Sequence, residues 1–342
     1  MTHKEFMAFI WPSLLAMALF IAIPIISVAY QSMFVEHEQI MIETETCGPF
    51  GCTPEVAVDQ DAMRKIREEA PAGRFNGLET YTNSSHLATD EITEIVATSE
   101  NFGEIRDRIM NLPFYKALIF TLSYTFIVTP LVIVFGFIIA VVVNSIPSVL
   151  KGPVIFFSLL PMIVTPLVGS LVLFWMIDSR GVVGAFLQYL FADPSLSLKA
   201  SPTLTWVTLF VYGVWHSAPF AFVVFYAGLQ TVPSDTLESS MVDGANRWEQ
   251  IRFVVMPYLL PLATFVALMQ LMDNFRIFEP IIGFSASASA TSLSYLIYTD
   301  LREAETPLFG SAAATSMLTI VGVIILLLPV LFRNAREFNR KA

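Results

Sequence analysis

Long apolar stretches without a charged side chain alternate with short polar segments along most of the chain. A central Asp, Lys or Arg in a bilayer costs about 2.5 to 3.5 kcal/mol, and a helix of about 20 apolar residues crosses the hydrocarbon. Charge-free stretches of that length therefore predict membrane spans. Six such stretches occur: Phe6–Val35, Ala117–Leu150, Gly152–Ile177, Ala200–Ser234, Phe253–Met272 and Thr306–Phe332.

Two further uncharged runs do not suit a span. Gly181–Ala192 is too short to cross a membrane and fits an interfacial or re-entrant helix better. Pro280–Thr299 is long enough, but its Ser- and Ala-rich centre favours a position outside the bilayer or along a cavity. The pattern therefore predicts an all-α polytopic membrane protein with six transmembrane helices, and an even number of spans puts both termini on one side.

Composition agrees with a membrane protein and locates the charge. Of the 342 residues, 55% are hydrophobic and 14% are charged, whereas a soluble domain carries about 25% charged residues. The formal net charge of −10 arises in one segment, because Phe34–Pro113 holds 16 acidic and 6 basic residues. Acidic and basic residues balance in the rest of the chain. We therefore expect no basic surface for nucleic acid.

Basic residues in the short loops predict the orientation. Eight Lys and Arg residues lie on the side of the termini and five on the other, so the positive-inside rule makes both termini cytoplasmic. The chain then has four parts: residues 1–35 with the first span, an acidic external loop at 36–113, a membrane core at 114–332 and a cytoplasmic tail at 333–342. The first span is too long for a secretory signal, although Ser27-Val28-Ala29 resembles a cleavage site.

The acidic loop is long enough to fold, and its sequence favours helices at Asp59–Glu69 and Asp90–Arg108. Both cysteines lie in it, as Cys47-Gly-Pro-Phe-Gly-Cys52. In an oxidising compartment such a close pair favours a disulfide, with inert free thiols as the alternative. Two thiols are too few for a structural metal site, so we expect no metal. The loop is either a docking surface for a soluble partner or a solvated insertion.

Several kinds of catalytic chemistry are missing. None of the six lysines follows a glycine, so the chain has no phosphate-binding loop of the Gly-Lys-Ser/Thr kind. The four histidines have no metal-ligand spacing. Among the spans, His216 is the notable ionisable residue, and such a residue is a functional candidate by default. The alternative is a neutral imidazole that is hydrogen-bonded to a neighbouring helix.

The most informative segment connects the fourth and fifth spans, at residues 231–257 on the predicted cytoplasmic side. Asp235 followed by Glu238 has the form of a capped helix start, and Gly244 can take the left-handed conformation that ends a helix. Asn246 followed by Glu249 then starts a second helix that leads into the fifth span. A short helix tied rigidly to a span could transmit a push from a cytoplasmic partner.

This segment resembles the EAA loop of the permeases of binding-protein-dependent ABC importers. The pattern of that loop is Glu-Ala-Ala, three residues, Gly, nine residues and Ile-x-Leu-Pro. The chain keeps the spacing and replaces the alanines by serines, in Glu238-Ser239-Ser240, Asp243, Gly244 and Pro257. Three C-terminal segments look like carbohydrate-uptake permeases of the maltose-transporter type: Phe275–Ile281, Tyr295–Tyr298 and Phe309–Ala314. The chain departs from that pattern after Ile281, where it reads Gly-Phe-Ser-Ala-Ser.

The resemblance implies a fold, partners and a division of labour. The fold would be that of a type I ABC importer permease, with six transmembrane helices and a periplasmic insertion between the first two. A periplasmic binding protein would deliver a sugar or related solute to this chain and a second, different permease in the bacterial inner membrane. Two copies of an ATPase would hold ATP and Mg, so this chain would bind no cofactor and would not be an enzyme. Its coupling residues would be Glu238, Ser239, Ser240, Asp243, Gly244 and Pro257.

A sugar pathway needs aromatic, amide and hydroxyl groups near the midplane of the membrane. Aromatic side chains at span ends also serve as interface anchors, which is the plainer interpretation of each one. The candidates are Tyr212, Trp215, His216, Gln270, Asn274, Phe278, Tyr295 and Tyr298.

Two other classes of protein fit the sequence less well. An ion-coupled secondary transporter would need internal repeats and a carboxylate within a span, and neither is found. A membrane-embedded enzyme would need a polar catalytic group near the membrane surface, and the acidic loop offers carboxylates without a recognisable pairing.

Overall fold

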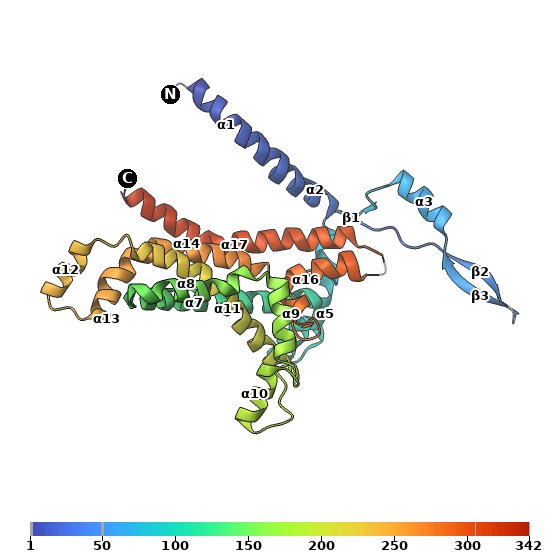
Figure 1. Ribbon diagram of the computed structural model, residues 1–342. Coiled ribbons are helices and arrows are strands. Elements are labelled where there is room, and N and C mark those ends of the chain that lie inside the picture. The colour runs from blue at the N-terminus through green and yellow to red at the C-terminus, as the bar shows by residue number, and fades with distance from the viewer. Residues whose placement is uncertain (1–2, 49–50, 305, 342) are drawn as a thin grey trace. The chain divides into compact units, whose positions relative to one another are not determined.

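The computed structural model describes residues 3–48, 51–304 and 306–341, and these form two compact units. The first unit holds the described residues up to Tyr115 together with Leu296–Val321. The second holds Lys116–Tyr295 and the described residues from Gly322 onwards. Each unit is built mainly from helices (Figure 1).

The first unit begins with a long apolar helix and continues into short helices and strands. Its elements are α1 (His3–Met17), the π-helical η1 (Ala18–Ala22), α2 (Ile23–Gln31), β1 (Phe34–Val35), β2 (Met41–Gly48), β3 (Gly51–Val58), α3 (Gln60–Glu69), β4 (Arg74–Phe75), α4 (Glu79–Thr82), α5 (Thr89–Thr98), α6 (Phe102–Met110), the π-helical η3 (Thr299–Glu303) and the start of α17 (Phe309–Lys341).

The second unit holds most of the long helices. Its elements are α7 (Pro113–Ser145), α8 (Ser148–Ile163), α9 (Pro166–Met176), α10 (Val182–Phe191), α11 (Pro202–Leu229), α12 (Ser234–Val242), α13 (Arg247–Gln250), the π-helical η2 (Ile251–Val255), α14 (Met256–Phe275), α15 (Glu279–Gly283), α16 (Leu293–Tyr298) and α17 from Gly322 onwards. The start of α7 and the end of α16 lie in the first unit.

Five helices within the described residues are long and apolar enough to cross a membrane. They are Glu5–Gln31, Pro113–Ser145, Pro202–Leu229, Arg247–Phe275 and Phe309–Arg333. The remaining predicted span is a broken pair, because α8 and α9 meet at an angle of 97°. Pro166 supplies no N–H and biases Thr165 toward an extended backbone, observed at φ −61° and ψ 146°. If the pair is one span, the count is the predicted six.

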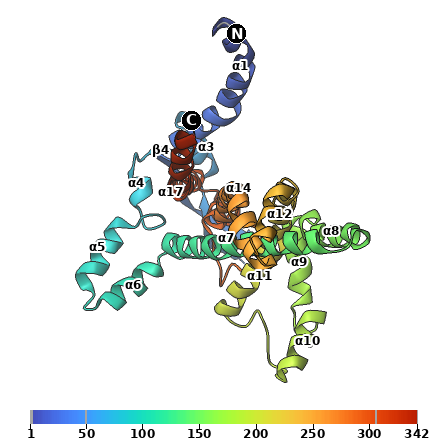
Figure 2. The same ribbon diagram turned by 90° about the vertical axis from the view of Figure 1, so that its left-hand side faces the viewer.

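The two uncharged runs that were not assigned to spans are short helices. Residues 181–192 contain α10, which extends away from the other helices of its unit in both views (Figures 1 and 2). The Ser- and Ala-rich run at 280–299 contains α15 and α16, separated by an irregular stretch.

Aromatic and small residues form the core of the second unit. Phe120 of α7 packs edge-on against Trp206 of α11 at a centroid distance of 5.0 Å, and Phe137 packs against Phe225 at 5.7 Å. A methyl group added at Gly136 would lie 2.5 Å from the Cβ of Ala221, so the two helices touch there. Burial of large aromatic side chains on both helices stabilises this pairing.

The acidic segment contains strands as well as the predicted helices. The helix predicted at 59–69 is α3, capped by the Asp59 carboxylate, which accepts from the backbone N–H of Asp61 and Ala62. The prediction of one helix at 90–108 was wrong, because extended backbone around Ser99 separates two helices, α5 and α6. The strands β2 and β3, which the sequence analysis did not predict, form an antiparallel hairpin (Figure 1).

The register of the hairpin sets Cys47 directly opposite Cys52. The side chains of both cysteines lie outside the described residues, so their pairing remains a prediction. Directly opposed residues in an antiparallel pair have Cβ atoms roughly 4.5–5.5 Å apart, close to the separation of about 3.5–4.5 Å that a disulfide needs.

We therefore expect both thiols to resist alkylation in the native protein without reductant and to be modified after reduction. Mass spectrometry of the peptide that spans residues 47–52 measures this, and the reduced sample is the control. Two alkylated thiols in the sample without reductant would contradict the disulfide.

Candidate functional site

The segment between α11 and α14 forms a short helix, a tight turn and a second helix start. Helix α12 begins at Ser234 with Pro233 as its N-cap and no side-chain cap. The capped start predicted at Asp235 was wrong, because the helix begins at Ser234 after Pro233 and no side chain caps it. Glu238 therefore lies beyond the free N–H groups of the first turn, and its side chain is exposed.

Gly244 ends α12 in a left-handed turn. Its φ is +86°, its N–H donates to the Met241 carbonyl over 3.0 Å, and the Ala245 N–H donates to the Ser240 carbonyl over 2.9 Å. This pair of bonds is the Schellman arrangement, which needs a residue with positive φ. A Cβ at Gly244 would meet nothing within 4 Å, so backbone strain alone opposes a side chain there.

The second helix start agrees with the prediction. Asn246 and Glu249 form a reciprocal capping box, with the Asn246 N–H donating to Glu249 over 2.7 Å and the Glu249 N–H donating to Asn246 over 3.0 Å. From Arg247 the chain is helical through η2 to Phe275. The π-helical turn η2 ends two residues before Pro257, which has no N–H for the preceding turn. The turn after α12 is thus joined to a long apolar helix without a loop.

Large apolar side chains of this segment are exposed. Val242 and Trp248 are 88% and 66% exposed, and Met241 and Phe253 are also exposed. They belong to elements that lie together at one end of the second unit (Figure 1). Met241, Val242 and Trp248 were not among the predicted site residues, although apolar residues in a polar connection indicate a contact surface.

Tyr212 and His216 on α11 hold the break between α8 and α9. The Tyr212 hydroxyl donates to the Pro166 carbonyl over 2.7 Å, and Nδ1 of His216 lies 2.9 Å from the Pro161 carbonyl. A carbonyl only accepts, so Nδ1 carries the proton. The two rings stack with centroids 5.8 Å apart and an interplanar angle of 6°. Both side chains thus bind backbone groups of the bent helix pair, which is the structural alternative considered for His216.

Of the other pathway candidates, Trp215 lies beside Tyr212 with ring centroids 6.0 Å apart, and two amide residues lie on α14. Trp215 lines an apolar cavity of about 610 Å³ between α7, α8 and α11. Gln270 and Asn274 are buried one turn apart on α14. The amide of Asn274 donates to the Thr129 hydroxyl over 3.0 Å, whereas Oε1 of Gln270 has no hydrogen-bond partner among the described atoms. The second unit thus contains a buried amide oxygen without a hydrogen-bond partner among the described residues.

Three aromatic candidates lie beyond the end of α14. Phe278 is half-buried at the start of α15, and Tyr295 is buried in α16. Tyr298 belongs to the first unit, so it is described apart from the other candidates.

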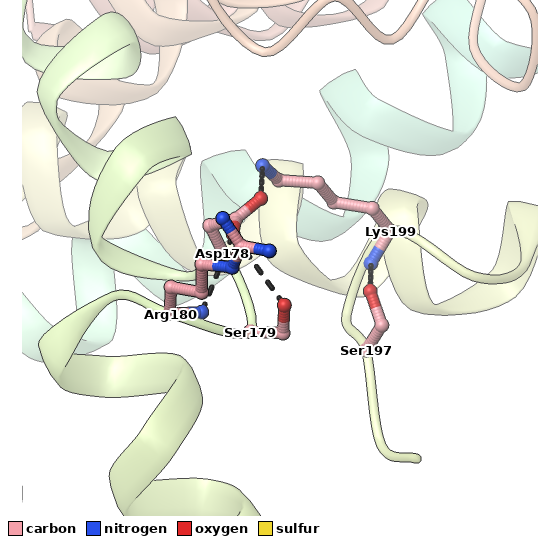
Figure 3. Close-up of polar contacts among 5 residues, drawn as sticks. All are labelled: Asp178, Ser179, Arg180, Ser197 and Lys199. Carbon is pink, nitrogen blue, oxygen red and sulfur yellow. Dashed lines mark hydrogen bonds and ion pairs between the residues drawn. The ribbon is translucent and has the colours of Figure 1, made fainter.

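An ion pair that was not predicted from the sequence joins the two ends of the segment that contains α10. The Lys199 ammonium lies 3.0 Å from the Asp178 carboxylate, which also accepts from the Arg180 N–H over 3.3 Å (Figure 3). The hydrogen bond from Lys199 is the main cause that lowers the pKa of Asp178 from its ordinary value. The ammonium also lies 3.3 Å from the centroid of the Phe174 ring. The sequence signal for this ion pair is that Asp178 and Lys199, with opposite charges, flank the apolar run at 181–192.

Comparison with known proteins gives consistent matches. The family described as binding-protein-dependent transport system inner membrane component matches residues 108–336. The chain is 28% identical over 263 residues to the probable ABC transporter permease protein YesP of Bacillus subtilis, covering 74% of this chain and 80% of that protein. It is 24% identical over 233 residues to the trehalose/maltose transport system permease protein MalF of Thermococcus litoralis, covering 66% and 76%.

Among solved structures, the fold resembles a chain of a bacterial ABC transporter involved in the import of the acidic polysaccharide alginate. The TM-score is 0.58 at 19% sequence identity, and the match covers 81% of this chain and 96% of that chain.

The role of Tyr212 can be tested against a matched tyrosine. Tyr212→Phe removes the hydroxyl that donates to the half-buried Pro166 carbonyl beside the helix break, so we expect a loss of roughly 0.5–1.5 kcal/mol in unfolding free energy. In Tyr258→Phe the lost hydroxyl donates to the Thr231 carbonyl at an exposed position, and we expect a change of less than about 0.5 kcal/mol. Thermal unfolding of the purified chain measures both. Equal stability of the two variants would remove the structural role of Tyr212.

Proposed function

Because the chain belongs to the family of inner membrane components of binding-protein-dependent transport systems, we propose that it forms part of the pathway by which an importer moves a sugar or related polar solute. The chain is a multi-pass permease subunit of a bacterial ABC importer, and the ATPase activity lies in a partner. The family itself binds no cofactor. ATP and Mg therefore belong to the partner ATPases.

The observation that carries the coupling mechanism is the geometry of α12 and the turn after it. The helix offers the exposed Glu238 and Val242 to a partner, and the bonds at Gly244 fix its direction. The capping box at Asn246 then joins it to the helix that ends at Phe275. A displacement of α12 by the closing ATPase pair would therefore move α14 and the buried Gln270 with it.

Two observations support a sugar as the substrate. The first is the description of relatives such as the trehalose/maltose permease, which carry that substrate class in their names. The second is the chemistry of α14, where the buried amide oxygen of Gln270 could accept a hydroxyl group one turn from Asn274. A second permease chain, different from this one, would supply the other half of the pathway.

The proposed orientation follows from the same mechanism. If α12 faces the ATPases, the residues 231–257 and both termini are cytoplasmic. The acidic segment 36–113 is then periplasmic, where it offers a surface to the binding protein. The membrane core would comprise residues 114–332, and residues 333–342 would form the cytoplasmic tail.

Replacement of Gly244 tests the coupling mechanism. A residue with a Cβ in the left-handed conformation costs roughly 1–2 kcal/mol, and a β-branched residue costs more. We therefore expect Gly244→Val to lower transport at least about tenfold while the chain still inserts into the membrane, and Gly244→Ala to have a smaller effect. Uptake into liposomes by the complete importer, with ATP inside and binding protein outside, measures this.

Gly152 provides the matched control. It lies in α8, where an added Cβ also meets nothing within 4 Å, and its φ lies outside the left-handed range. Gly152→Val should transport normally. Normal uptake by Gly244→Val would refute the coupling role, and uptake by the chain alone without ATPase would instead support an ion-coupled secondary transporter.

A further inference from the structure

The first unit contains a cavity of about 380 Å³ that the transport mechanism does not use. This volume falls within the roughly 300–1,000 Å³ that is typical of sites for small molecules. Its main walls come from residues 31–39 at the end of α2 and beyond, from the turn at 71–73 and from residues 306–309. All of these residues belong to the first unit.

Hydrogen bonds and one close backbone approach tie the three walls together. Nε2 of His37 lies 2.9 Å from the Ala70 carbonyl, next to the turn. The Gly310 N–H donates to the Glu36 carboxylate over 2.9 Å, which joins the first wall to the start of α17. The φ of Gly73 is +95°, and a Cβ added there would clash with a carbonyl oxygen of β1. The sequence therefore builds the cavity with specific contacts between segments that are far apart in the chain.

Four polar side chains of the first wall line the cavity and keep hydrogen-bonding groups available. The amides of Gln31 and Gln39 have no hydrogen-bond partner among the described residues. In the neutral ring of His37, Nε2 carries the proton because the Ala70 carbonyl only accepts, so Nδ1 is an acceptor. Glu36 uses one carboxylate oxygen for α17, and the other can accept. The cavity thus offers two amide donors and several acceptors.

The rest of the lining is largely apolar. Met63 of α3 is buried at the cavity, whereas the ring of Phe309 is exposed. Pro71 and Pro307 add further apolar surface. A sugar has hydroxyl groups around its ring and C–H groups on its faces, so it needs both polar partners and apolar surface. The lining offers this combination, a mainly apolar wall with a few polar groups, which is general for small-molecule sites.

Charge argues against other classes of ligand. No Lys or Arg of the described residues lines the cavity, and the segment from Phe34 to Pro113 holds 16 acidic against 6 basic residues, so an anion would be repelled. The charge of Glu36 is offset at the positive end of α17 and does not require a cation. The described residues contain no group of three or more His, Cys, Asp or Glu side chains that suits a metal ion.

We propose that this cavity is a binding site for a neutral sugar. In the proposed orientation it lies on the periplasmic side, just after the first span, where a binding protein would deliver the solute. The choice of a sugar among neutral polyhydroxyl ligands rests on the proposed function, whereas the geometry of the cavity does not depend on it.

Hydrogen–deuterium exchange of the full chain in phospholipid nanodiscs, prepared without glycoside detergents, tests the proposal. Glucose, maltose and trehalose are each titrated to about 50 mM, well above the Kd of about 1 mM that a weak site would have. At least one of them should slow exchange about threefold or more, with saturation, in peptides that cover residues 70–73 and 306–310, because a ligand stabilises the closed walls. No protection by any of the three would overturn the proposal.

Two variants remove the amides that hold no bond within the described part of the protein. Gln31→Leu and Gln39→Leu should therefore fold, and each should weaken binding roughly threefold to tenfold. Gln60→Leu is the matched control, because Gln60 is exposed at the start of α3 and does not line the cavity. It should bind like the wild type, and it shares any general effect of sugars on exchange. Equal protection in the wild type, Gln31→Leu and Gln39→Leu would overturn the proposal.

An acidic counterpart of the bound sugar, glucuronate in the case of glucose, tests the role of charge. It should bind at least about threefold more weakly than the neutral sugar. Glu36→Gln keeps an acceptor for the Gly310 N–H and should narrow this difference. Equal binding of the neutral and the acidic sugar to the wild type would contradict a site for neutral ligands.

These measurements use the chain without the ATPase and the binding protein, so they are independent of transport. A complete importer that moves no sugar would defeat the proposed function and leave sugar binding in the cavity standing. An importer that does move a sugar, with a cavity that binds none of the three, would defeat the present inference alone.

Discussion

The hydrocarbon of a membrane offers no water to backbone N–H and C=O groups, so each break in a helix at that depth needs another hydrogen-bond partner. The structure meets this requirement with side chains from neighbouring helices. Tyr212 and His216 bind the carbonyls on either side of the break between α8 and α9. In the irregular stretch before α16, the Ser292 hydroxyl donates to the Ile277 carbonyl, and the Thr121 hydroxyl accepts from the Leu293 N–H. At these two irregular places, side chains of α7 and α11 and the nearby Ser292 supply the hydrogen bonds.

The same constraint is absent at the end of the second unit that carries α12. There the chain turns sharply at Gly244 with backbone bonds alone and restarts with a capping box at Asn246. The polar requirements are met locally, so the apolar side chains of Val242 and Trp248 are left exposed. A rigid turn with an exposed apolar surface suits a contact with a soluble partner, while the continuous helix from Arg247 to Phe275 carries a displacement toward the buried groups of α14.

Much of this could be predicted from sequence because it depends on local patterns. Charge-free runs located the spans, and the spacing from Glu238 to Pro257 located the short helix with its Gly244 turn. The angle between α8 and α9 could not be predicted, because a proline at the first position of a helix is also common in straight helices. The bend also involves hydrogen bonds from Tyr212 and His216, which lie far along the chain. The hydrogen bond from Gly310 to Glu36 crosses 274 residues, a separation that no local pattern encodes.

The account depends most on α12 being the element that enters the ATPase. The most direct measurement is cross-linking from Val242→Cys in the assembled importer, with Cys47 and Cys52 replaced by serine and Val149→Cys as control. Val149 has a similar exposure, at 84% against 88%, and lies in α8. The account predicts that a short bifunctional reagent joins the chain to the ATPase from position 242 and much less from position 149. An ATPase that co-purifies with the chain but forms no cross-link at position 242 would contradict it.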